Sequence, residues 1–434
     1  MPNKTEVLIV GAGPVGMLTA LLLTRHGIQV RIVDQESRTA AHSYACALHP
    51  ASLRLLEQID LAEEVVQLGR RSKIVSVFEG HERRAHLDFS GLPGRYPFAV
   101  ALEQSMLENL LEQRLRRAGI KIGWNYRLLE IKPHGDRMDA CLEKLDSADG
   151  SWAFASTAGE RTTLQADFVI GADGHHSTVR QRMDIRVIQI GTPQLFAVYE
   201  METAEPVDHV MKLVFNKSAV SALWPLAEHK CRWSFQVVPP RSKSEFPRKN
   251  RAALISIRER RSMDKMDDLL GFLAERVPWF PAGTIRDMNW IAHVQFERQM
   301  ASRFGQGRCW MAGDAAHQTS PAGMQSMNRG LLEGADLADR IKAILRREAD
   351  LESLQIYNRV HCAEWRRLLG LKEQNERPHS FSSWARSHLP SIFNQEDQGV
   401  PPRSFPSWAR RHFGSILRSL PATGDDLKHL LEQF

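Results

Sequence analysis

The amino terminus constrains this chain most strongly, because an apolar segment, VLIV at residues 7–10, leads into the glycine pattern GAGPVG and then into the helix-periodic segment MLTALLLTRHG. This order of strand, glycine-rich turn and helix is typical of the βαβ unit that binds a dinucleotide. Gly11 permits the tight turn, Gly13 lets the backbone approach a pyrophosphate, and Gly16 lets the helix pack close to the strand. The helix amino terminus then offers N–H groups and a favourable dipole to the phosphates.

An acidic residue completes this unit. Gly27 ends the predicted helix, the strand QVRIV follows, and Asp34 stands at its tip. The spacing suits a carboxylate that accepts a hydrogen bond from a ribose hydroxyl, and it disfavours a phosphorylated ribose. A βαβ unit that binds nothing is the alternative, and the common register of strand, glycines, helix and acid argues against it. The βαβ unit alone does not show whether the bound dinucleotide is NAD or FAD.

Two later segments repeat the order of apolar strand, glycine and acid. In DFVIGADGHHSTVR, residues 167–180, an apolar strand leads to Asp173 and Gly174, and a helix is expected to start at Ser177. RCWMAGDAAHQTSPAGMQSMNRGLLEGADLADRI places Gly313 and Asp314 after another apolar strand. The second carboxylate can hold a hydroxyl of a polyol.

The loop after this carboxylate contains Pro321 and Gly323, and a helix is expected from about Asn328. N–H groups at the start of that helix can face the electron-rich edge of a ring. The carboxylate for a polyol hydroxyl and the N–H groups for a ring edge together suit a flavin with its ribityl chain.

Composition limits the class of protein and its partners. A chain of 434 residues, 43% hydrophobic and 25% charged, is expected to be soluble and globular, with two or three domains. The net charge of +6 gives no case for nucleic acid as the main partner. Five cysteines without CxxC spacing indicate neither a disulfide framework nor a metal site, so we expect reduced thiols in a cytoplasmic protein. The apolar run at residues 7–23 resembles a signal-peptide core, but the βαβ unit explains it.

With these three motifs in this order, the chain resembles the FAD-dependent aromatic hydroxylases, the class A flavoprotein monooxygenases of the para-hydroxybenzoate hydroxylase type, over roughly residues 5–370. The resemblance implies FAD as bound cofactor and NADPH or NADH as transient reductant. It also implies that O2 forms a flavin hydroperoxide, from which one oxygen passes to an electron-rich aromatic ring. The cofactor-binding residues that it implies are Gly11, Gly13, Gly16, Asp34, Gln104, Asp173, Gly174, Gly313, Asp314, Pro321, Gly323 and Asn328.

The resemblance gives these residues separate tasks. Asp34 and the glycines of GAGPVG bind the ADP half, while Asp173, in a DG motif, serves the flavin and the passing nicotinamide cofactor. Asp314 holds the ribityl chain, and Gln104, in ALEQSMLENLL, lies beside the flavin at the start of a helix. The residues that bring backbone to the isoalloxazine are Pro321, Gly323 and Asn328.

The chain departs from the family pattern at two places. The family loop reads close to P-x-G-G-Q-G-x-N and this loop reads PAGMQSMN, so Met324 and Ser326 replace small or glycine positions. A side chain at Ser326 is expected to narrow the path of a moving flavin or to change the backbone angle there. Gln35 and Tyr44–Ala45 stand where the family commonly has a basic residue and an Arg–Ala pair. The resemblance therefore gives weaker support for the family's NAD(P)H contacts in this chain than for its FAD contacts.

Alternating apolar runs, LFAVYEMET, HVMKLVFN, SALWPLA and CRWSFQVV, predict half-buried strands of an antiparallel sheet that covers the flavin. The family places substrate contacts on such strands, which makes Tyr199, Trp224 and Pro225 candidates for the substrate pocket, with Pro321 of the loop. The alternative is that the aromatic residues are core packing residues. His317, in GDAAH, is either a catalytic base or a structural residue, and we favour the structural role because the expected chemistry needs no base there.

We therefore predict an α/β protein with a Rossmann-like FAD-binding domain, an antiparallel-sheet substrate domain that interrupts it, and a helical C-terminal tail. The FAD-binding domain is expected at residues 1–70, 101–184 and 286–376, the substrate domain at 71–100 and 185–285, and the tail at 377–434. The tail repeats FSSWARSHLPSIF as FPSWARRHFGSIL, and contact with a membrane, an access lid and packing over the protein or a second subunit all stay open. The segment RAALISIRERR is expected to be a basic surface helix.

The expected function is FAD-dependent, NAD(P)H-consuming hydroxylation of an aromatic or polyketide-like small molecule in secondary metabolism. A first rival is a flavin halogenase or a dehydrogenase on the same fold, although the chain has no W-x-W-x-I-P segment. A second rival is a flavin-binding protein that has lost turnover, which the departures at Met324 and Ser326 motivate. Substrate identity and oligomeric state stay open.

Overall fold

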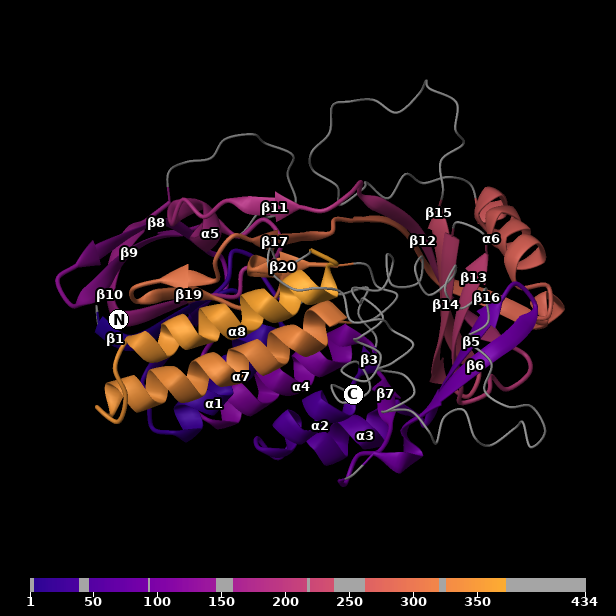
Figure 1. The fold of residues 1–434 in the computed structure, drawn as a ribbon, viewed down its shortest axis with the longest axis horizontal. Helices are drawn as coiled ribbons and strands as arrows, with labels where there is room; N and C mark the ends of the chain where they lie inside the picture. Colours follow the sequence, from indigo (N-terminus) through magenta and orange to yellow (C-terminus); the bar gives the residue numbers. More distant parts are fainter. Residues whose placement is uncertain are drawn as a thin grey trace, which may run out of the picture.

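The structure is a computed structural model that describes residues 4–38, 47–92, 94–145, 159–216, 219–237, 262–319 and 325–371. Figure 1 shows two parts, an α/β domain that contains both β1 and the long helices, and a sheet domain flanked by α6. The predicted α/β class is confirmed. The predicted tail and the segment RAALISIRERR lie outside the described residues.

The α/β domain is built on a sheet of order β18-β19-β10-β1-β2, which β9 and β8 extend. Strands β1, β2, β10 and β19 run parallel, and β9 pairs antiparallel with the first half of β10. The central strands are buried on both faces, which explains their continuous apolar runs. The strands are β1 (Lys4–Val10), β2 (Val30–Val33), β8 (Tyr126–His134), β9 (Arg137–Lys144), β10 (Arg161–Gly171), β18 (Gly305–Gln306) and β19 (Cys309–Met311).

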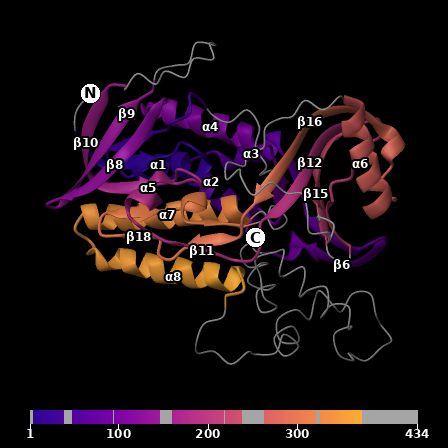
Figure 2. The same ribbon diagram turned by 90° about the horizontal axis from the view of Figure 1, so that it is seen from above.

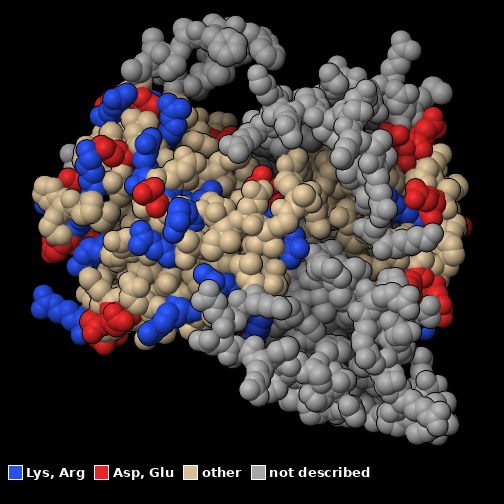
Figure 3. All heavy atoms as spheres, turned by 45° about the horizontal axis from the view of Figure 1, so that its top comes forward, with Lys and Arg blue, Asp and Glu red and all other residues tan. Residues whose placement is uncertain are grey.

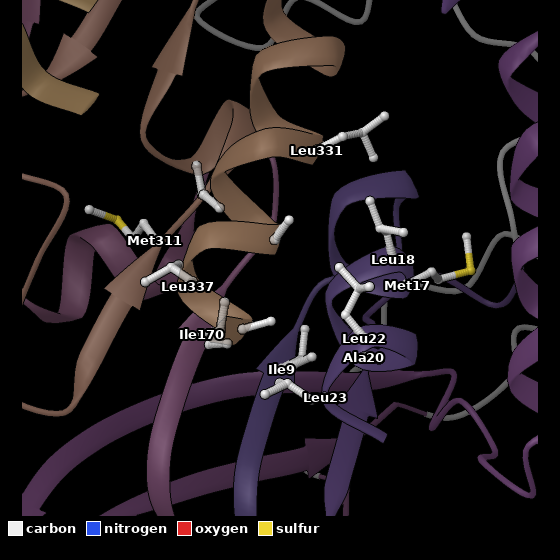
Figure 4. Close-up of a cluster of buried hydrophobic side chains, with 14 of the residues drawn as sticks. Ile9, Met17, Leu18, Ala20, Leu22, Leu23, Ile170, Met311, Leu331 and Leu337 are labelled. Atoms are coloured by element: carbon white, nitrogen blue, oxygen red, sulfur yellow. The ribbon is translucent and has the colours of Figure 1, made fainter. Parts of the chain in front are cut away.

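Four long helices lie side by side along this sheet in the order α4, α1, α7, α8 (Figure 2). They are α1 (Pro14–Arg25), α4 (Gln104–Arg117), α7 (Gln325–Leu345) and α8 (Glu352–Leu368). Leu22 of α1, Leu337 of α7 and Ile9 of β1 belong to one buried cluster, drawn in Figure 4. Pro14 begins α1, three residues before the helix-periodic segment, and Gly27, at φ +77°, follows the end of the helix, as the sequence predicts for this glycine.

The sheet domain has the strand order β16-β12-β15-β14-β13-β5-β6. Neighbouring strands run antiparallel except β13 and β5, which run parallel. The predicted antiparallel sheet therefore contains one parallel pair, because β5 and β6 come from an earlier stretch of chain and are not joined to β13 by a hairpin. The elements are β5 (Ile74–Glu79), β6 (Glu82–Asp88), β12 (Gln194–Thr203), β13 (Met211–Asn216), β14 (Ala219–Ala227), β15 (Lys230–Val237), β16 (Ile285–Phe296) and α6 (Ser262–Arg276).

The central strands of this sheet are buried on both faces, whereas the sequence predicts half-buried strands. On one face Tyr199, Trp233 and Phe235 pack with Leu269 and Leu273 of α6. The other face packs against apolar residues of β7 and the segment before it, so the sheet lies between α6 and the α/β domain (Figures 1 and 2). Covering of both faces removes the polar positions that produce an alternating pattern.

Short elements connect the two domains. Two further sheets have the orders β3-β7-β4 and β11-β17-β20. Their strands are β3 (Ala47–Leu48), β4 (Arg70–Ser72), β7 (Ala99–Ala101), β11 (Val187–Gln189), β17 (Gln299–Ala301) and β20 (His317–Gln318). The remaining helices are α2 (Pro50–Glu57), α3 (Ala62–Leu68) and α5 (Thr178–Arg182), with short 3-10 turns at Phe89–Gly91, Ala282–Thr284 and Gly313–Ala315.

Strand pairing bears on the domain boundaries. Strand β16 pairs with β12 along its length, so we propose that the sheet domain extends to Phe296 and does not end at residue 285. Strand β11 pairs with β17, whose other partner β20 follows the GDAAH segment. We therefore propose that the sheet domain starts after β11 and not at residue 185.

Candidate functional site

Three loops meet at the carboxyl ends of the neighbouring strands β1, β10 and β19. The amide of Ala172, after β10, donates to the carbonyl of Val10 at 2.7 Å. The amide of Ala312, after β19, donates to the carbonyl of Gly171 at 3.0 Å. Parallel strands end at the same edge of a sheet, so the GAGPVG, GADG and GDAAH segments lie together although they are far apart in the sequence.

The glycines of the first loop have different surroundings. Gly11 adopts φ +107°, and a Cβ there would lie 2.1 Å from the carbonyl oxygen of Ala172. A Cβ at Gly16 would lie 2.0 Å from the carbonyl oxygen of Gly11. Gly13, the N-cap of α1, has no neighbouring atom within 4 Å of a Cβ and no side chain caps that helix. The first and last glycines therefore permit close packing, and the middle one leaves open space at uncapped N–H groups, which fits a phosphate.

Asp34 follows the last residue of β2, beside the first loop. Its Oδ2 atom accepts a hydrogen bond from the amide of Ala12 at 2.6 Å, and its Oδ1 atom accepts one from the amide of Glu36 at 2.9 Å. Two backbone donors thus fix the carboxylate next to the start of α1, where a ribose is expected.

Asp173 caps α5 from the second loop. Its carboxylate accepts hydrogen bonds from Ser177 Oγ at 2.6 Å and from the amide of Val179 at 3.0 Å. Burial raises the pKa of Asp173, and these hydrogen bonds only partly oppose that shift. Gly174 follows at φ +72°. The predicted helix start at Ser177 is confirmed, because its hydroxyl accepts from the amide of Arg180.

Arg180 joins the second loop to the third. Its guanidinium donates to the carbonyl of His175 at 2.7 Å and to the carbonyl of Ala315 at 2.6 Å. The side chain is buried, so both hydrogen bonds are shielded from water. This role of Arg180 was not predicted from the sequence.

Asp314 stands in the third loop, directly after Gly313 at φ +65°. Burial raises the pKa of Asp314, while His317 and hydrogen bonds from the side chains of Gln318 and Ser326 act in the opposite direction. The hydroxyl of Ser326 also accepts from the amide of Thr319 at 3.3 Å. The serine that departs from the family pattern therefore touches the carboxylate expected to hold the ribityl chain.

Glu333 of α7 binds the third loop through its carboxylate, a contact that was not predicted from the sequence. One oxygen accepts from the amide of Gly313 at 2.9 Å and lies 2.7 Å from Nε2 of His317, and the other accepts from Trp365 Nε1 at 2.6 Å. The rings of His317 and Trp365 stack at 3.7 Å. Burial acts to raise the pKa of Glu333, but His317 and the hydrogen bonds hold it below its ordinary value. His317 is thus fully enclosed, in agreement with the structural role favoured above.

The start of α7 differs from the prediction. The helix begins at Gln325, three residues before Asn328, so Asn328 lies within its first turn. Oδ1 of Asn328 accepts from the amide of His49 at 2.9 Å and from Ser52 Oγ at 2.6 Å. Its Nδ2 atom donates to the carbonyl of Ala47 at 3.0 Å. These bonds join α7 to β3 and α2.

Two buried polar side chains at this corner lack partners among the described residues. Both amide atoms of Gln325 and the hydroxyl of Thr319 have no hydrogen bond there. A buried amide without a partner is costly, and a ligand with donors and acceptors on its edge satisfies it. The isoalloxazine of FAD has such an edge, so the residues present fit this cofactor. Gln104 lies at the first position of α4, as predicted, and donates to Glu108 at 2.7 Å.

The substrate candidates do not share one face of the sheet. Trp224 belongs to the cluster that faces the α/β domain, whereas Tyr199 belongs to the cluster under α6. Pro225 pairs with Cys231, a member of the cluster under α6. The three residues thus lie on two faces of the sheet, because neighbouring positions of a strand point to opposite faces, and their contact with a substrate stays a prediction. Tyr199 packs in the hydrophobic core under α6, as the alternative to a substrate contact predicts.

Several predicted residues lie outside the described residues, and their roles stay predictions. They are Pro321, Gly323, Met324 and the pair Tyr44–Ala45. Within the described residues, Cys141, Cys231, Cys309 and Cys362 are free thiols. None of the described helices combines the length and the hydrophobicity needed to cross a membrane. Figure 3 shows basic and acidic side chains interspersed over the visible face of the α/β domain, in keeping with the small net charge.

The parallel sheet, the three converging loops and the inserted second sheet define a two-domain flavoprotein fold. A family model described as "FAD binding domain" matches residues 4–367, and the chain belongs to this family of FAD-binding proteins. The α/β domain is therefore its FAD-binding domain.

Two curated relatives have named activities. The chain is 31% identical to 6-methylpretetramide 4-monooxygenase of Streptomyces rimosus over 360 residues, which cover 81% of this chain and 58% of the relative. It is 28% identical to pentachlorophenol 4-monooxygenase of Sphingobium chlorophenolicum, with 81% and 61% covered. The chain thus spans about three fifths of the length of these relatives.

Solved structures share the fold. The p-nitrophenol 4-monooxygenase of Pseudomonas putida superposes with a TM-score of 0.69 at 21% identity, covering 99% of this chain and 96% of the other. A complex of aklavinone-11 hydroxylase with FAD and aklavinone superposes with a TM-score of 0.64 at 23% identity, covering 85% and 68%.

Proposed function

We propose that this protein is an FAD-dependent monooxygenase that hydroxylates an aromatic or polyketide-like small molecule in secondary metabolism, with NADPH or NADH as reductant and O2 as oxygen donor. The observation that carries the proposal is the meeting of three loops that fit FAD beside an apolar sheet face. Two relatives are named as monooxygenases of a polyketide and of a phenol, and these names support hydroxylation as the reaction. The four free cysteines named above support a reducing, cytoplasmic location.

The binding roles follow from the contacts. The start of α1 at Gly13 is proposed to bind the phosphates, and Asp34 to accept a hydrogen bond from the ribose. Asp314, with Ser326 beside it, is proposed to hold the ribityl hydroxyls. Gln325 is proposed to satisfy its buried amide on the isoalloxazine edge. Bound FAD supplies the redox chemistry, since it accepts a hydride from NAD(P)H and activates O2.

The substrate is proposed to lie between the flavin and the sheet face that bears Trp224. This face also carries Phe196, Val198, Ala222 and Val294, all in one buried cluster. An apolar face excludes water from the reacting centre and offers aromatic contact to a planar substrate. We therefore propose Trp224 as a substrate contact, and we assign no such role to Tyr199 or Pro225.

The deciding experiment measures oxidation of NADPH and NADH by the purified FAD-loaded protein with a panel of phenols, quinones and polycyclic aromatic compounds. Mass spectrometry of the products is expected to show the gain of one oxygen atom. Incorporation of halide would instead identify a halogenase. Tight FAD binding without consumption of either reductant under any aromatic compound would identify a flavin-binding protein that lacks turnover.

A further inference from the structure

Charged side chains form a continuous chain from the FAD-binding domain into the sheet domain. Nζ of Lys230 lies 2.6 Å from Oε1 of Glu103 and 2.6 Å from Oε1 of Glu200. Arg232 donates from Nε and Nη2 to Oε2 of Glu200 at 3.1 and 2.5 Å. Each carboxylate oxygen of Glu200 therefore faces a different cation.

One end of this chain lies next to Gln104, which the family resemblance places beside the flavin, and the other end lies next to Trp224, the proposed substrate contact. Glu103 is the N-cap of α4 and directly precedes Gln104. Arg232 pairs with Trp224 on one side and with Glu200 on the other, and its guanidinium lies 5.2 Å from the ring centre of Trp290. Paired residues of neighbouring strands share a face of the sheet, so the charges lie on the face that bears Trp224.

Burial makes this arrangement rigid. The side chains of Glu200 and Arg232 are 6% and 4% exposed, and that of Lys230 is 25% exposed. Burial acts to lower the pKa of Lys230, but its hydrogen bonds to Glu103 and Glu200 raise it above the ordinary value, so the side chain stays an ammonium. A buried charge that loses one partner is strongly destabilised, so Lys230 holds both carboxylates at fixed positions.

We propose that Lys230 is a positioning residue, which sets the substrate face of the sheet at a fixed place relative to the start of α4 and thus to the flavin. The inference rests on the proposed function. Lys230 contacts both domains through one ammonium group, so movement of the sheet away from α4 would break a charged hydrogen bond between two partly buried side chains, Lys230 at 25% and Glu103 at 28% exposure. A misplacement of the substrate by about 1 Å can cost on the order of a hundredfold in rate. O2 that has taken two electrons from NAD(P)H through FAD but is not transferred to a substrate would take up two protons and leave as H2O2.

The test compares Lys230→Met with a matched control on the same sheet, Lys212→Met. Lys212 lies on β13, and its Nζ atom is 2.5 Å from Oδ1 of Asp208, so it loses an ion pair of similar length that stays within the sheet domain. Two measurements are made on FAD-loaded protein. One is the share of oxidised NAD(P)H that appears as H2O2, and the other is hydrogen exchange in peptides that span the first turn of α4.

For Lys230→Met we expect a several-fold larger H2O2 share and roughly tenfold faster exchange at the start of α4, the effect of losing one charged hydrogen bond. Glu103→Gln, which neutralises the partner on α4, should reproduce both changes, and Lys230→Arg should restore most of the wild-type behaviour. Lys212→Met should change neither quantity. The inference is overturned if Lys230→Met leaves both unchanged, or if Lys212→Met changes both equally. If wild-type protein does not turn over, the proposed function fails, and the exchange measurement alone decides whether Lys230 holds the domains in register.

Discussion

The loop layer after β1, β10 and β19 and the core of the sheet domain are both tightly packed, but in different ways. In the loop layer, backbone packs on backbone, as where Gly11 meets Ala172 and Gly16 meets Gly11. In the sheet domain, large side chains fill the space between the sheet and α6, as where Trp233 stacks on Phe235 at 5.2 Å. Gly11 and Gly16 therefore admit no additional carbon atom, whereas the core of the sheet domain admits side chains of other shapes at similar volume.

The largest effect is expected for Gly11→Ala. The new Cβ would lie 2.1 Å from a backbone oxygen at φ +107°, which costs about 4 kcal/mol or more and should abolish FAD binding. Thermal unfolding and FAD retention on gel filtration measure this. The control is Gly13→Ala, whose Cβ meets no atom within 4 Å; it should keep the fold and lose FAD affinity alone. Equal destabilisation by both variants would contradict the distinction between the two glycines.

The sheet domain core is tested by Trp233→Ala, for which we expect a loss of about 3–4 kcal/mol in the free energy of unfolding. The side chain is fully buried among Phe235, Trp279 and Phe280, so a cavity results. Urea unfolding measures the loss. Trp224→Ala, on the opposite face, should in addition raise KM for an aromatic substrate, because its ring is proposed to contact that substrate. A KM unchanged by Trp224→Ala would argue against the proposed substrate face.

Glu333→Gln tests the support behind the loop layer and is expected to cost about 2 kcal/mol at pH 7, since it disturbs three hydrogen bonds to a buried carboxylate. The pKa of Glu333 is held below its ordinary value, so its contribution is present above the unfolded pKa of about 4.3 and disappears as pH falls through the folded pKa. Unfolding free energy measured between pH 7 and pH 3 should therefore fall less steeply in the variant. Glu348→Gln, at an exposed position, serves as control. If the unfolding free energy falls equally steeply between pH 7 and pH 3 in both variants, Glu333 does not make the proposed pH-dependent contribution.

The smallest effect is expected for Ser326→Gly, which removes the hydroxyl between Asp314 and the amide of Thr319. We expect a change of about 1 kcal/mol, or several-fold in the dissociation constant of FAD, because one hydrogen bond is lost and a glycine loosens the first turn of α7. Titration of apoprotein with FAD measures it. Ser326→Ala separates the two causes, and unchanged affinity in both variants would show that Ser326 does not act on the cofactor site.

Local patterns in the sequence predicted most of the FAD-binding domain. The turn at Gly11, the acid at Asp34 and the N-cap at Ser177 occur where expected, since each depends on neighbours within one βαβ unit or one turn. Helix α7 begins three residues before the expected start, and the hydrogen bonds of Asn328 to His49 and Ser52 leave no local trace in the sequence. The sheet domain was predicted as antiparallel strands, and the parallel pair β13–β5 was missed for the same reason.

The fold class, the order of the three loops and the family resemblance could be predicted from the sequence, because strand, glycine and acid recur there at short spacings. Which side chains meet is visible only in the folded chain: Tyr199 turns toward α6 while Trp224 faces the FAD-binding domain, and Lys230 joins Glu103 to Glu200. The physical reason is that these contacts depend on the register of strands and helices that lie far apart in the chain. A shift of one residue in that register would move every side chain of a strand to the opposite face.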